Sequence, residues 1–176
     1  MNWEHERWIR AQADFVDYSV PMHTAAMFAV VTAQPSGSDV EKKKLFSDVS
    51  SRFLSDMLFE CGVDETGVLK TCVLRRPARN KTKSTLPIVS IESKILKAIK
   101  KDKETRNLYN EEAKHLWATL IYWGLPTLVL GKVARVTMEG FEASLMPDDP
   151  CLPIVVYAAS PRFIMLKADK KQKKIF

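Results

Sequence analysis

The side chains whose types and spacing could do chemistry in this chain are mostly cationic. Residues 75–83 read RRPARNKTK, and the five cations among them are Arg75, Arg76, Arg79, Lys81 and Lys83. A second set follows at helical spacing: Lys94, Lys97, Lys100 and Lys101. Such clusters bind nucleic-acid phosphates without sequence preference, or the headgroups of an anionic membrane. No aromatic residue lies between 70 and 106, which favours phosphate contacts over stacking on bases.

The positive charge is concentrated in the middle of the chain and in the C-terminal segment from Arg162 to Phe176, which has a net charge of +5. The net charge is +6 over 176 residues, but residues 70–106 carry twelve Lys or Arg against three acidic residues, a net of +9. Such concentration predicts a polyanionic partner. The alternatives are a solvated charged face and a short basic nuclear-import signal.

Both ends of the chain hold further candidates for binding. The C-terminal tail contains Lys170, Lys171, Lys173 and Lys174 before Ile175 and Phe176, so it is a candidate for contact with a membrane interface or a partner. The alternative is a frayed terminus. The N-terminal segment contains Trp3, Trp8 and Phe15. Because large aromatic residues often anchor interfaces, these three are candidates for self-association, with packing on the protein's own sheet as the alternative.

Catalytic and metal-binding patterns are scarce. The three histidines lie in separate contexts, no His or Cys has metal-ligand spacing, and no phosphate-binding or hydrolase motif is present. The sequence therefore predicts no enzyme activity, no cofactor and no metal. An enzyme with a site assembled from scattered residues, around His115 or Glu112, is the alternative class.

Length and composition predict one domain without disulfides. A chain of 176 residues can bury a sufficient core. The three cysteines are expected to be reduced and packed among apolar residues. No apolar run reaches the length of a membrane span. We expect an N-terminal arm over 1–20, a core domain over 21–168 and a basic tail over 169–176.

The expected elements mix strands and helices. Strands are predicted over 22–33, 68–75, 127–138, 151–159 and 162–168, with a polar loop over 34–44. A helix is predicted from Ser47 to Cys61 with Gly62 after it, followed by a basic amphipathic helix near 91–103. A third helix near 107–123 has Asn107 or Asn110 as its cap, with Glu111 and Glu112 in its first turn. Because βαβ alternation is not regular, the pattern predicts an α+β domain with a mostly antiparallel sheet and about three helices.

The front half of the chain resembles the central domain of rhabdovirus matrix proteins, in particular the short matrix proteins of plant-infecting members. The resemblance covers residues 22–80 and rests on an opening strand, a polar loop, Phe46, and a Ser47-Asp48-Val49 helix start. The amphipathic helix 49–61 and the strand 67–74 complete it. The sequence lacks the lysine-rich N-terminal arm and the late-domain peptides of better-known members.

The resemblance implies a non-enzymatic virion protein that self-associates and drives assembly and budding. It would bridge the viral nucleocapsid to the inner face of an anionic membrane, and it would be found in the virion, the host cytoplasm or the nucleus. The nine cations of 75–101 would then form the polyanion-binding surface. The alternative is a basic RNA-binding regulatory protein, such as a silencing suppressor or movement factor, with no membrane role.

Overall fold

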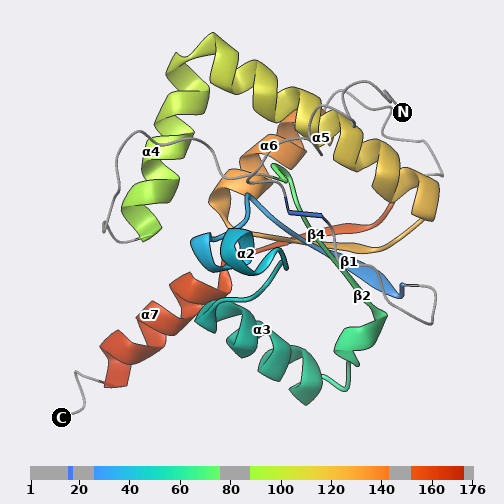
Figure 1. Cartoon of the computed structure of the whole chain (residues 1–176), viewed down its shortest axis with the longest axis vertical. Coiled ribbons are helices and arrows are strands. Elements are labelled where there is room, and N and C mark those ends of the chain that lie inside the picture. The colour runs from blue at the N-terminus through green and yellow to red at the C-terminus, as the bar shows by residue number, and fades with distance from the viewer. Residues whose placement is uncertain (1–15, 18–25, 76–87, 143–151, 173–176) are drawn as a thin grey trace.

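The computed structural model of the chain describes residues 16–17, 26–75, 88–142 and 152–172 (Figure 1). The strands are β1 (Phe28–Thr32), β2 (Val68–Cys72), β3 (Thr127–Leu130) and β4 (Val155–Ala158). The helices of the first half are α2 (Gly37–Lys42), α3 (Val49–Glu60) and the short 3-10 helix η1 (Glu65–Gly67). The helices of the second half are α4 (Ile88–Lys101), α5 (Lys103–Trp123), α6 (Lys132–Glu142) and α7 (Pro161–Gln172).

Within these residues, four strands form one sheet in the order β2-β1-β3-β4, and every neighbouring pair is parallel. The predicted antiparallel α+β arrangement is therefore wrong. Parallel neighbours need crossover connections, and each strand here is followed by at least one helix. The helices α4, α5 and α6 pack on one face of the sheet, and α3 covers the other, as in doubly wound α/β proteins.

The fold prediction failed mainly at two segments that were expected to be strands. Residues 132–142 form α6, and residues 161–172 form α7. In α6 the buried side chains are Val133, Ala134, Thr137 and Met138, which recur at the period of a helix. The apolar residues of this segment also alternate with a period of two, as in a strand. Packing against the rest of the protein therefore determines that the segment is a helix.

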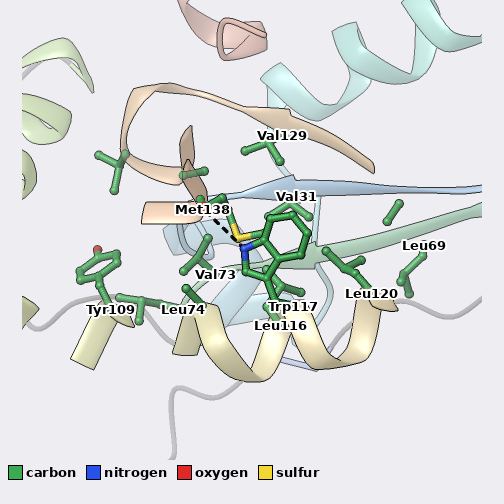
Figure 2. Packing of buried hydrophobic residues seen from close by; sticks show 14 of the residues in the cluster. Val31, Leu69, Val73, Leu74, Tyr109, Leu116, Trp117, Leu120, Val129 and Met138 are labelled. Atoms are coloured by element: carbon green, nitrogen blue, oxygen red, sulfur yellow. Dashed lines mark hydrogen bonds between the residues drawn. The ribbon is translucent and has the colours of Figure 1, made fainter. Parts of the chain in front are cut away.

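The larger core lies between the sheet and the helices α4, α5 and α6. Its centre is Trp117 of α5, which is 1% exposed and whose indole N–H donates to the backbone carbonyl of Met138 over 3.3 Å (Figure 2). Leu116 and Leu120 of the same helix pack against Val31 and Leu69 of the strands. Deep burial of Leu116, Trp117, Leu120 and Ile121 was predicted from sequence. It is confirmed for the first three, whereas Ile121 is only partly buried.

The boundaries of α5 differ from the prediction. The helix starts at Lys103, and its N-terminal cap is Asp102, whose carboxylate accepts from the Thr105 N–H over 2.9 Å. Glu111 and Glu112 consequently lie in the middle of the helix, away from its positive end, and Glu112 is buried. The favourable interaction with the helix dipole that was predicted for both carboxylates is therefore wrong.

The smaller core lies under α3 on the opposite face of the sheet. Leu54 and Leu58 of α3 pack on Val30, Val68 and Leu130. The predicted helix is confirmed, with Asp48 as its cap and a left-handed Gly62 after its end. Cys72 is buried, whereas Cys61 is exposed and not packed in the core as expected. The predicted loop over 34–44 contains the short helix α2.

Candidate phosphate-binding surface at the carboxyl edge of the sheet

All four strands end at the same edge of the sheet, which we call the carboxyl edge. In Figure 1 this edge lies on the left, where α2, α6 and α7 begin. Ligands of open parallel sheets bind outside this edge, next to the point where the strand order reverses. In the order β2-β1-β3-β4 that point lies between β1 and β3.

The predicted basic segment leaves the sheet at this edge. Pairing continues beyond β2, because the N–H groups of Val73 and Leu74 donate to Thr32 and Ala33 over 2.8 and 3.0 Å. Arg75 follows at the rim, half-buried, and its carbonyl accepts from the Val16 N–H over 2.8 Å. The other predicted cations of this segment lie outside the described residues: Arg76, Arg79, Lys81 and Lys83.

The predicted basic helix is confirmed as α4. Ile95 is buried against the larger core, and Leu96 and Ile99 pack beside it. The cations of the opposite face are all exposed: Lys94, Lys97, Lys100 and Lys101. Among the described residues, none of these four lysines takes part in an ion pair. The end of α4 is held by Arg106, whose guanidinium donates to the carbonyls of Ile99 and Lys100 over 3.0 and 2.5 Å.

The carboxyl end of β3 adds a cation that the sequence analysis did not select. Gly131 has φ 91°, a backbone conformation that favours glycine, and its N–H donates to the Ala158 carbonyl over 2.9 Å. The chain therefore turns directly from β3 into α6. Lys132, the first residue of α6, is exposed at the positive end of that helix.

The carboxyl end of β4 has a similar construction. The Ser160 carbonyl accepts from the Phe163 N–H over 2.9 Å, and Pro161 occupies the first position of α7, where proline is favoured. Arg162 follows and is exposed. Arg162 also acts on Asp48, the N-terminal cap of α3. Burial opposes ionisation of Asp48, but hydrogen bonds from Ser51 and Ser50, together with the positive charge of Arg162, hold its pKa below the usual value.

The carboxyl end of β1 is a tightly bonded loop. Ser36 caps α2, and the buried Asp39 accepts from the N–H groups of Ser36 and Ser47 over 2.8 and 2.6 Å. Two residues without glycine's freedom, Lys43 and Phe46, have left-handed backbones with φ 50° and 59°. Strained backbone of this kind persists only where surrounding contacts determine it, and it is common at functional sites.

The charges at the carboxyl edge are predominantly positive. Its exposed cations among the described residues include Lys43, Lys44, Lys132 and Arg162. Four acidic side chains are described near these cations: Asp39 and Asp48 are occupied as helix caps, Glu41 is exposed on α2, and Asp17 follows Val16 at the rim. The N-terminal ends of α6 and α7 add partial positive charge. The arrangement can hold several phosphate groups along one edge.

The remaining predicted site residues lie away from the carboxyl edge or outside the residues that the structure describes. Lys170 and Lys171 belong to α7 and not to a separate tail, whereas Lys173 and Lys174 lie outside the described residues. The residues proposed for self-association also lie outside them: Trp3, Trp8 and Phe15. Within the described ranges, no group of three or more His, Cys, Asp or Glu side chains could hold a metal ion, and no helix is long and apolar enough to cross a bilayer.

Comparison with known proteins finds no match to any protein-family model and no similar curated protein. The resemblance to rhabdovirus matrix proteins therefore stays a prediction.

Proposed function

We propose that this protein binds nucleic acid through its phosphates, using the carboxyl edge of the sheet together with the lysine face of α4. The observation that carries the proposal is the convergence of basic segments at this edge. Arg75, Lys132 and Arg162 follow β2, β3 and β4, whose carboxyl ends lie at one edge of the parallel sheet, with β1 between β2 and β3. Contacts of this kind give affinity without base readout.

The charge-reversal variant Lys132→Glu/Arg162→Glu tests this proposal. Two lost phosphate contacts should weaken binding of a labelled single-stranded oligonucleotide by roughly tenfold or more at moderate salt, and reduce the slope of log K against log salt by about 1.4. Fluorescence anisotropy over a salt titration measures both. The control is Lys114→Glu, at an exposed site in the middle of α5, and its effect is compared with that of each edge substitution made singly.

Equal effects of the single edge substitutions and of Lys114→Glu would contradict the proposal. A parallel titration with anionic vesicles distinguishes the matrix-type role from binding of nucleic acid alone. Vesicle binding lost with the same variant would favour a protein that bridges nucleocapsid and membrane, and vesicle binding without oligonucleotide binding would reject the nucleic-acid proposal.

A second candidate function, binding of a single nucleotide, is favoured by the strand order. In the sheet, β2 lies on one side of β1, and β4 lies on the opposite side of β3, so the connections after β1 and β3 run in opposite directions. The expected ligand position is therefore the crevice outside the carboxyl ends of β1 and β3. Gln34, Pro35 and Gly131 follow directly after these two strands. In the same titration, a free mononucleotide that displaces the oligonucleotide would support this candidate.

A further inference from the structure

The outer edge of β4 is the least protected edge of the sheet. β4 is the last strand in the order, so no further strand of the described residues pairs with it. Residues 153–160 read PIVVYAAS and carry no charge. Natural proteins usually block such an edge with charged residues, bulges or covering segments, because its backbone groups otherwise pair with another chain.

The opposite edge is protected in this way. Lys70 stands in the middle of β2, and its side chain pairs with Glu65. Beyond the end of β2, the Val16 N–H bonds to the Arg75 carbonyl. The two edges of the sheet therefore differ: among the described strands, only β4 combines an edge that no other strand pairs with and uncharged, β-branched side chains.

The hydrogen bonds to β3 show which backbone groups of β4 face outward. Thr127 N–H donates to the Ile154 carbonyl over 2.8 Å, and Gly131 N–H donates to the Ala158 carbonyl. Residues 154, 156 and 158 therefore direct their backbone groups toward β3. By the alternation of a strand, Val155 and Tyr157 direct theirs to the outer edge.

We propose that a second copy of this chain pairs with this edge, β4 against β4 and antiparallel, about a two-fold axis at Val156. In this register Val155 of one copy exchanges both backbone hydrogen bonds with Tyr157 of the other, and the reverse pair does the same. Val156 then lies opposite itself as a non-hydrogen-bonded pair, the type in which side chains are closest. The result is one continuous sheet through both copies.

The side chains agree with this register. On the α3 side of the sheet, Ile154 and Val156 are 73% and 55% exposed, although both are apolar. The two-fold pairing places Val156 against Val156 and Ile154 against Ala158, so it covers the exposed row with its own copy. On the other face it places Val155 beside Tyr157, a β-branched and aromatic pair of the kind that stabilises adjacent strands.

Charge also favours a second copy in this orientation. A charged residue at the two-fold position would meet itself and repel, and position 156 is Val. Antiparallel pairing places the cationic carboxyl edges of the two copies at opposite ends of the joint sheet. Their repulsion is therefore small, and the pairing is isologous and closed, which limits it to a dimer.

A disulfide crosslink tests the register directly. Val156→Cys is made in a background with Cys61→Ser and Cys151→Ser, and it should give a disulfide-linked dimer under mild oxidation because the two Val156 positions face each other. The matched control is Tyr122→Cys in the same background, at an apolar site that is 85% exposed on α5. Crosslinking of the control to the same extent would overturn the proposal.

Two further variants test the pairing without a crosslink. Val155→Pro removes an outward N–H that the monomer does not use, and Val156→Lys brings two like charges together. Light scattering on the unmodified chain should give a mass approaching twice 20.0 kDa at high concentration. Both variants should raise the dissociation constant about tenfold or more, with unchanged circular dichroism. A wild-type chain that stays monomeric, or a dimer that both variants leave intact, would overturn the proposal.

Discussion

The hydroxyl of Tyr109, a residue of α5, lies in the larger core. The residue is 1% exposed, and among the described residues its hydroxyl is a buried polar side-chain group without a partner. Burial also raises the pKa of this phenol above its usual value. The ring therefore fills apolar volume in the core, while the buried hydroxyl costs free energy of desolvation.

Tyr109→Phe is therefore expected to increase the free energy of unfolding by about 1 kcal/mol. Urea denaturation followed by circular dichroism measures the change. A decrease would contradict this assignment, because it would mean that the hydroxyl is satisfied, for example by a buried water.

Lys70 combines charge with partial burial in β2. Its ammonium lies 5.8 Å from the centroid of the Phe46 ring and pairs with Glu65. Burial and, to a lesser extent, the neighbouring Lys44 lower the pKa of Lys70 to about 8. The unfolded chain thus holds this proton up to a higher pH than the folded protein does, so Lys70 makes the protein more stable as pH rises from about 8 to about 10.5.

Lys70→Met should remove this pH dependence and stabilise the fold at pH 7 by ~1 kcal/mol, a value reduced for partial solvent exposure. Glu65 remains hydrated in the variant because its side chain is 42% exposed. Thermal unfolding at pH 7 and at pH 10 compares the two proteins. A variant that loses stability at pH 7 would show that the ion pair outweighs desolvation.

At the scale of elements, the connection between β1 and α3 depends on one buried carboxylate. Asp39 belongs to the capping box of α2 and also accepts the Ser47 N–H. It therefore joins both ends of the turn that contains the left-handed residues Lys43 and Phe46. Without it, the strained turn would lack its main polar support.

Asp39→Ala should lower the free energy of unfolding by about 2 kcal/mol, since one cap and one further buried hydrogen bond are lost. Asp39→Asn, which keeps one acceptor oxygen, should lose less. Asp56→Ala, at an exposed position of α3, is the control. Chemical denaturation ranks the three variants, and equal losses for Asp39→Ala and Asp56→Ala would disprove the role of Asp39.

Individual elements were predictable where one periodicity dominated. The helix α3 and the lysine-faced helix α4 were found from their apolar spacing, and β2 from its β-branched run. The segment of α6 was assigned to a strand because Val133, Arg135 and Thr137 also alternate with Ala134, Val136 and Met138. Only packing of Val133, Ala134 and Met138 into one core distinguishes the helix.

At the scale of the whole molecule, the basic segments could be identified from the sequence, but the edge of the sheet at which they lie could not. Arg75 and the α4 lysines stood out as local charge clusters. Lys132 did not, because it is a single cation in its sequence context, and Arg162 counted only as the first cation of the basic C-terminal segment. They become part of one surface only through the strand order, which single-sequence patterns do not encode.

The central pairing of the sheet also has a consequence for how the chain acquires its structure. β1 pairs with β3 from Ala29 to Thr127, so the first hydrogen bond between them closes a loop of roughly a hundred residues. On a ribosome, β1, α3 and β2 emerge long before β3 does. The basic edge therefore cannot assemble until most of the chain has been synthesised, and until then the apolar face that β1 presents to β3 and α5 lacks these partners.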